Sequence, residues 1–99
     1  MSKLAPHSRW MNLVAQAGCV ICNRFERVES APHIHHVAEG SGVRSDYMVA
    51  GLCPEHHLGA TGLHGMGPRN FLRFYRPPGE SEYGLLGWVA EDITKKGLI

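Results

Sequence analysis

No stretch of the 99-residue sequence approaches the roughly 20 consecutive apolar residues that a membrane-spanning helix needs. The amino-terminal segment Met1–Pro6 lacks the apolar core of a secretory signal peptide, so we expect an intracellular, cytoplasmic protein that does not contact a membrane. The chain also lacks an excess of charge of one sign, because its formal net charge is only +1. This balance excludes binding to nucleic acid through bulk positive charge, so any basic surface must be local.

Cysteine is scarce as well, since the chain has only three cysteines, and an odd number cannot pair completely within one chain. A reducing location favours thiolate metal ligands over disulfides. Hydrophobic residues make up 43% of the chain and charged residues 19%, which is typical of a folded protein. We expect one domain over residues 1–99, whose modest core would gain stability from a bound metal ion.

The hydrophobic pattern predicts an α+β fold in which a helix is followed by two short strands and then by further helices. Four glycines between Leu58 and Pro68 argue against regular structure there, and residues 23–30 are polar and irregular. We expect Phe71, Leu72, Phe74 and Tyr75 to point inward. The predicted elements are a helix over 6–17 ended by Gly18, strands over 32–37 and 47–52, a flexible loop over 39–42, a turn into a helix after Cys53, a helix over 69–76, and a last helix over 82–96 capped by Ser81.

Two pairs of potential zinc ligands share the same short spacing, Cys19-x-x-Cys22 and Cys53-x-x-His56. Each pair can supply two ligands from one tight turn, and zinc in structural sites takes four such ligands in a tetrahedron. Together they predict a closed structural Zn²⁺ site that ties the first helix to the junction after the second strand.

Other interpretations of these residues remain open at this stage. Cys19 and Cys22 could form a redox pair, although the βαβ pattern that accompanies such pairs is missing and Cys53 would be left over. The cysteines could also be inert core residues. His57 competes with His56 for the place of the fourth zinc ligand.

Histidine is abundant, with seven residues, and four of them fall beside the zinc pattern: His35, His36, His57 and His64. Phosphodiester hydrolysis needs a base for the attacking water and a cation that stabilises negative charge, and neutral imidazole suits both tasks. Since adjacent strand residues point to opposite faces, we assign His35 to a metal ion and His36 to the general base. The alternative is that these histidines form a solvated polar face of the strand.

The combination of His35-His36-Val37, Leu52-Cys53-x-x-His56-His57 and the preceding Cys19-x-x-Cys22 resembles the HNH endonuclease family. The resemblance implies a ββα-metal (HNH, His-Me finger) core, in which a β-hairpin and a helix hold one divalent ion, with a structural zinc knuckle and flanking helices. It implies that His35 and His57 bind the catalytic ion, that His64 completes the site, and that His36 is the base.

The run from His56 through Gly62-Leu63-His64-Gly65 to Tyr75 is more specifically similar to phage recombination-enhancement nucleases, which act with RecA. The sequence departs from the HNH pattern at two points. His56 stands where cysteine is usual, and the Asn that names the motif is missing near Met48. Asp46 or Ser45 could replace that Asn in bracing the loop between the strands.

Arginines provide the candidate contacts to DNA phosphates. Arg69, Arg73 and Arg76 recur at spacings of four and three residues, which places them on one helix face, and Arg44 lies in the predicted loop. The alternative is a solvated helix face without a ligand. The large aromatic residues Trp10, Trp88, Phe71 and Phe74 are interpreted as core residues, and the last helix could pack on the domain or mediate dimerisation.

The sequence therefore favours a metal-dependent endonuclease with one structural Zn²⁺ and a catalytic Mg²⁺, Mn²⁺ or Zn²⁺. Its expected partners are DNA and a recombinase filament. A non-catalytic zinc module that binds nucleic acid or protein would explain the cysteines and His56 but would leave the other histidines without a role. A metal-storage protein ranks last, because the chain has no flexible histidine-rich tract.

Overall fold

The computed structural model describes residues 6–38, 42 and 44–99. Most of the loop predicted over 39–42 lies outside these residues. The described elements are α1 (Pro6–Ala17), a π-helical turn η1 (Cys22–Glu26), β1 (His33–His36), β2 (Val49–Leu52), α2 (Pro54–Leu58), α3 (Leu63–Met66), α4 (Pro68–Tyr75), the 3₁₀ turn η2 (Pro78–Glu80) and α5 (Glu82–Lys95).

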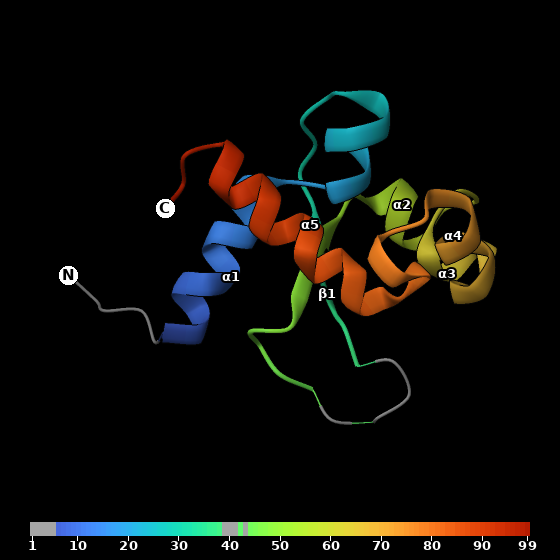
Figure 1. Cartoon of the computed structure of the whole chain (residues 1–99), viewed down its shortest axis with the longest axis horizontal. Coiled ribbons are helices and arrows are strands. Elements are labelled where there is room, and N and C mark those ends of the chain that lie inside the picture. The colour runs from blue at the N-terminus through green and yellow to red at the C-terminus, as the bar shows by residue number, and fades with distance from the viewer. Residues whose placement is uncertain (1–5, 39–41, 43) are drawn as a thin grey trace.

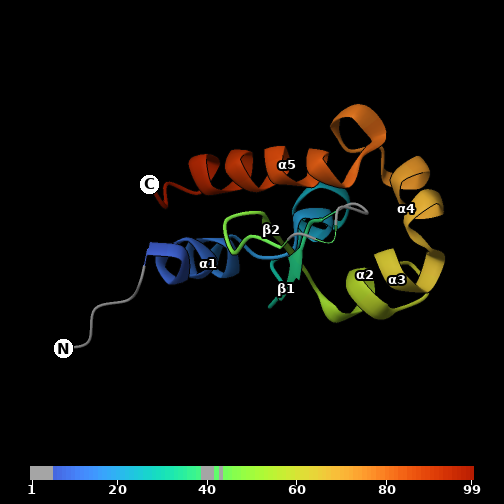
Figure 2. The ribbon, with the colours of Figure 1, turned by 90° about the horizontal axis from the view of Figure 1, so that it is seen from below.

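This arrangement confirms a small α+β fold with one two-stranded antiparallel sheet. In the sheet, His33 pairs with Leu52 and His36 pairs with Val49. Figures 1 and 2 show the short helices α2, α3 and α4 gathered at one end of the molecule and α1 at the other, with α5 running from the first group until its carboxyl-terminal part lies beside α1. The histidine-bearing strand β1 therefore lies between α1 and the group of short helices.

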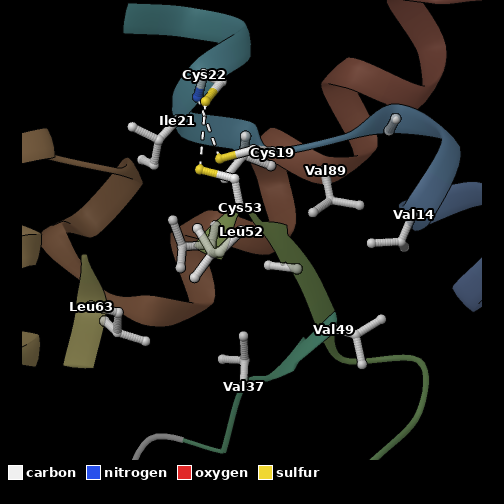
Figure 3. Packing of buried hydrophobic residues seen from close by; sticks show 14 of the residues in the cluster. Val14, Cys19, Ile21, Cys22, Val37, Val49, Leu52, Cys53, Leu63 and Val89 are labelled. Atoms are coloured by element: carbon white, nitrogen blue, oxygen red, sulfur yellow. Dashed lines mark hydrogen bonds between the residues drawn. The ribbon is translucent and has the colours of Figure 1, made fainter. Parts of the chain in front are cut away.

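The core forms around β2, because all four residues of this strand are buried. Helices α1 and α5 both pack against it. Valines and leucines from these elements meet the residues that follow α1, as Figure 3 shows. The fully buried side chains include Val14, Ile21, Leu52, Leu85, Val89 and Ile93. The last helix thus packs on the domain, which was one of its two predicted roles.

A close contact between the end of α1 and the sheet positions the first of the predicted zinc ligands. Gly51 lies so near the end of α1 that a Cβ atom at this position would approach the backbone oxygen of Gly18 to 2.4 Å. Gly18 itself has a φ of +84°, a left-handed conformation that glycine adopts without strain. These two glycines let the chain end α1 and place Cys19 against β2.

A buried polar network holds α5 in place against η1. Asp92 is 6% exposed and accepts hydrogen bonds from Arg24 and Asn23, both at 2.9 Å. Ser81 caps the helix by accepting from the backbone N–H of Tyr83, as the sequence predicted. Both ends of α5 are thereby held, and its first turn has a fixed position relative to β1.

Two local predictions were wrong. The glycine-rich segment after Leu58 contains the short helix α3, because Gly62 begins it in an extended conformation and Gly67 ends it with a φ of +91°. The segment after Cys22 contains η1 rather than only irregular structure. Glycines supplied the caps of α3, although their number suggested a loop.

Phe74 was also predicted wrongly as an inward-facing core residue, because its side chain is 68% exposed. Phe71 and Tyr75, four residues apart, form the buried stripe of α4, and Phe74 lies beside it with its ring edge-on to Tyr75. Trp10 and Trp88 pack partly buried against the core. Within the described residues, no helix has the length and apolar character that crossing a membrane requires.

Candidate metal centres

The first candidate centre joins three cysteines and one histidine, all of them buried: Cys19, Cys22, Cys53 and His56. Cys19 lies between α1 and η1, Cys22 is the first residue of η1, Cys53 follows β2, and His56 lies on α2. Figure 3 shows the three cysteine side chains pointing toward one another at the edge of the core, next to Leu52. All three cysteines are free, so no disulfide competes for the sulfur atoms.

The spacing of the four ligand atoms fits zinc. With zinc–sulfur bonds of about 2.3 Å and zinc–nitrogen bonds of about 2.0–2.1 Å, a tetrahedron has sulfur–sulfur edges of about 3.8 Å and sulfur–nitrogen edges of about 3.6 Å. The Sγ atoms of Cys22 and Cys53 are 3.7 Å apart. The Nδ1 atom of His56 lies 3.5, 3.4 and 3.2 Å from the sulfur atoms of Cys19, Cys22 and Cys53.

The pKa values of the cysteine thiols also favour a bound metal ion. Burial, with a smaller contribution from the nearby Cys19, raises the pKa of Cys22 to about 12. Burial also raises the pKa of Cys19. Several thiolates cannot be accommodated side by side without a cation, so a metal ion would displace protons from these thiols as it binds. This cluster is closed, as structural zinc sites are.

Glu26, at the end of η1, contacts the outer side of the cluster. Its carboxylate accepts from Cys22 Sγ at 3.4 Å and lies 3.7 Å from His56 Nε2. Since Nδ1 of His56 faces the sulfur atoms, Nε2 is the nitrogen that faces Glu26. Glu26 was not singled out from the sequence, because nothing in the ligand spacing marks it.

The second candidate centre joins His35 from β1, His57 from α2 and His64 from α3. One ring nitrogen of each lies within 4.8 Å of the others. Exposure rises from the buried His35 through the half-buried His57 to the exposed His64. The cluster is therefore open to solvent on one side, as catalytic metal sites are.

Imidazole binds a cation in its neutral form, and the surroundings of His57 favour that form. Burial, with smaller contributions from charge on the neighbouring histidines, lowers the pKa of His57 to about 4. Protonating this ring would place positive charges close together in a partly desolvated position. His57 therefore offers a lone pair to a divalent ion, and the two clusters together could hold metal at two separate places.

The structure separates His56 from His57, which compete for zinc in the sequence. His56 lies with the cysteines and His57 with His35 and His64. His33, which is not among the histidines assigned a role from the sequence, lies on the same side of β1 as His35 and places its Nδ1 3.0 Å from Nδ1 of His57. Alternation along the strand was the signal that could have found it.

His36 is not a member of the three-histidine cluster and makes two hydrogen bonds of its own. Its Nε2 lies 2.8 Å from Asp46 Oδ1, and its Nδ1 lies 2.9 Å from Nη2 of Arg44. The hydrogen bond from His36 is the main cause that lowers the pKa of Asp46. Ser45 supports the same turn, because its hydroxyl accepts from the backbone N–H of Tyr47.

The four arginines predicted to contact DNA are all exposed. Arg69 and Arg73 lie one turn apart on α4. Arg76 follows the helix in a left-handed conformation and donates from Nε to the carbonyl of Arg73 at 3.4 Å. Arg44 lies apart from these three, beside His36.

The fold and these two clusters define a small α+β protein with one closed and one open candidate metal centre. Residues 4–79 match the family model described as recombination enhancement, RecA-dependent nuclease, and the chain belongs to this family. The match confirms the resemblance inferred from the histidine and cysteine motifs, and its name indicates a nuclease. Comparisons with curated proteins and with solved structures found no match.

Proposed function

We propose that the protein is an HNH-type endonuclease that hydrolyses DNA phosphodiester bonds, with β1, β2 and α2 as a ββα-metal core within one domain. In this proposal, Cys19, Cys22, Cys53 and His56 hold a structural Zn²⁺, and His35, His57 and His64 hold one catalytic divalent ion. The observation that carries the proposal is the convergence of three imidazoles from three elements. A fourth histidine follows His35 on β1 and has an acidic partner.

The two partners of His36 determine which of its nitrogens would act as the base. A carboxylate can only accept, so the hydrogen bond to Asp46 places the ring proton on Nε2. A guanidinium can only donate, so Arg44 faces the lone pair of Nδ1. With these two partners, Nδ1 is the nitrogen of His36 that can accept a proton.

We infer the following roles in the reaction. His36 Nδ1 accepts a proton from the attacking water, whose oxygen forms the new bond to phosphorus as the bond to the leaving oxygen breaks. Asp46 keeps the ring in this orientation and stabilises the imidazolium that results. Arg44 would exchange its contact with Nδ1 for a phosphate oxygen, which frees the base as the substrate is held. A divalent ion, when bound, supplies charge stabilisation at the phosphate.

The proposed partners are DNA and a recombinase filament of the RecA type. The filament follows from the description of the family, and DNA from the exposed arginines together with that description. Because the net charge of the chain is only +1, contacts to phosphate depend on the local arrangement of Arg44, Arg69, Arg73 and Arg76.

Replacing Arg73 with alanine should weaken DNA binding equally for different sequences. A lost phosphate contact lowers the slope of log affinity against log salt concentration by about 1. Fluorescence anisotropy with labelled DNA at several salt concentrations measures both quantities. Lys95→Ala is the matched control, since Lys95 is 72% exposed and ends α5, far from α4 (Figure 2). Equal slopes for both variants would show that α4 is only a solvated face.

The function is tested by counting metal ions and by measuring cleavage. We expect the parent protein to bind two ions, to cut DNA with added Mg²⁺ or Mn²⁺, and to stop when the added ion is removed. His57→Ala should bind one zinc ion and leave DNA intact. Elemental analysis after dialysis and a plasmid-nicking assay with a recombinase filament provide the readouts.

A non-catalytic zinc module is the second candidate, and the closed cysteine cluster favours it because a structural zinc ion there would stabilise the fold without taking part in catalysis. It predicts one tightly bound zinc ion, no second ion and no cleavage under any metal condition. It also predicts that His57→Ala has the same metal content as the parent.

A further inference from the structure

Helix α5 contributes a carboxylate to the open histidine cluster. Glu82, in the first turn of α5, places Oε1 2.8 Å from Nε2 of His35, although the two residues are 47 positions apart in the sequence. The contact is well shielded from solvent, since the side chain of His35 is 10% exposed and that of Glu82 is 13% exposed. The match to the nuclease family ends at residue 79, before this helix begins.

The chemistry of the contact assigns the two nitrogens of His35. A carboxylate accepts, so His35 donates from Nε2–H, and Nδ1 is the nitrogen that keeps a lone pair. Histidines that bind metals commonly donate their other N–H to a carboxylate, which fixes the ring orientation and increases the electron density on the ligating nitrogen.

The packing of α5 places Glu82 beside His35. Leu85 and Val89 of the same helix are buried in the core, and Asp92 is held by Arg24. Gly84 lies against the preceding turn so closely that a Cβ atom there would approach the carbonyl oxygen of Pro78 to 2.2 Å. The carboxylate is therefore presented to His35 by a preformed scaffold.

We propose that Glu82 is a positioning residue for the open metal centre, acting through His35 and setting its affinity for the divalent ion. The proposal rests on the proposed function in one respect, namely that His35, His57 and His64 bind an ion. It adds that a helix outside the family-matched segment completes this centre.

Metal affinity of zinc-loaded protein is the primary readout, measured by calorimetry with Mn²⁺ and by the absorption spectrum of Co²⁺. Glu82→Ala should weaken binding of the second ion by about 10- to 100-fold. Glu82→Gln should weaken it by less than about tenfold, because the amide oxygen still accepts from His35 Nε2–H. Glu80→Ala, an exposed glutamate two residues away, should bind the ion as the parent does.

The DNA-cleavage activity of Glu82→Ala should depend on the Mn²⁺ concentration more strongly than that of the parent. With saturating Mn²⁺, Glu82→Ala should cut DNA at a rate close to that of the parent, and at low Mn²⁺ it should be much slower. Parent-like affinity in Glu82→Ala, with only a lower melting temperature, would overturn the proposal in favour of a purely structural contact. Equal losses in the Gln and Ala variants would overturn it in favour of direct ligation by Glu82.

The outcomes for the parent separate this proposal from the proposed function. A parent that binds the second ion through these histidines but does not cut DNA contradicts the nuclease alone and leaves the role of Glu82 to be decided by the affinities. A parent that binds no second ion contradicts both.

Discussion

His36→Ala is expected to lower the rate of DNA cleavage by about 10²- to 10⁴-fold, the contribution of a well-placed general base. His36 hydrogen-bonds to Asp46 and Arg44, and it is not a member of the histidine cluster. The variant should therefore keep its fold, its zinc and its affinity for the second ion. Single-turnover cleavage at saturating metal, together with circular dichroism and metal analysis, measures these quantities.

Two further variants identify the base. Asp46→Ala should retain part of the activity, because Nδ1 of His36 keeps its lone pair but the ring loses the partner that orients it. His33→Ala should alter the affinity for the second ion and not the rate at saturation, since His33 contacts His57. Parent-like cleavage by His36→Ala would refute the mechanism. If His33→Ala alone lost the reaction at saturating metal, the base would be His33.

His56→Ala is expected to unfold the protein or to leave it without fixed tertiary packing. A structural zinc ion contributes roughly 10 kcal/mol or more to the folding of small zinc domains. A typical domain has a net stability of only about 5–15 kcal/mol. Losing one of four ligands in a buried cluster therefore removes most or all of the margin. The melting temperature and the near-ultraviolet circular dichroism of zinc-loaded samples measure the effect.

The neighbouring residue supplies the matched control. His57→Ala removes the same side chain one position later on α2, but from the open cluster, so it should fold and bind zinc while losing the second ion. His56→Cys should retain zinc, because four thiolates also form a closed tetrahedral site. A His56→Ala protein that melts like the parent would show that the cysteine cluster does not depend on a metal ion.

The sequence was sufficient for features that depend on short-range spacing. The pairs Cys19-x-x-Cys22 and Cys53-x-x-His56 lie in tight turns, so their ligand atoms are brought together locally. The ends of α1 and α5 also follow from nearby signals, namely Gly18 with its positive φ and the capping hydroxyl of Ser81.

The helix α4 shows where hydrophobic pattern fails. Phe71 and Tyr75 lie on one face, and Phe74 falls about 60° from Phe71 and 100° from Tyr75 on a helix of 3.6 residues per turn. A helix of eight residues buries only one narrow stripe, so a third large apolar side chain remains outside. Apolar character alone does not show which of these aromatic side chains face the core.

Adjacent histidines show the same limit at the metal centres. Residues that follow each other on a helix point about 100° apart, so His56 and His57 must face different neighbours. Both have the same chemistry, and the spacing from Cys53 only favours the first. The packing of α2 between the cysteine segment and β1 assigns one ring to sulfur and the other to His35 and His64.

Spacing and residue type alone therefore establish the family, the α+β order of elements and the residues able to bind metal, because these features arise within a few positions of each other. The contacts of Asp46 with His36, of Glu26 with His56 and of Glu82 with His35 become recognisable only in the folded chain. These contacts join separate elements, up to 47 positions apart for Glu82 and His35, and such contacts exist only where packing of the core brings those elements together.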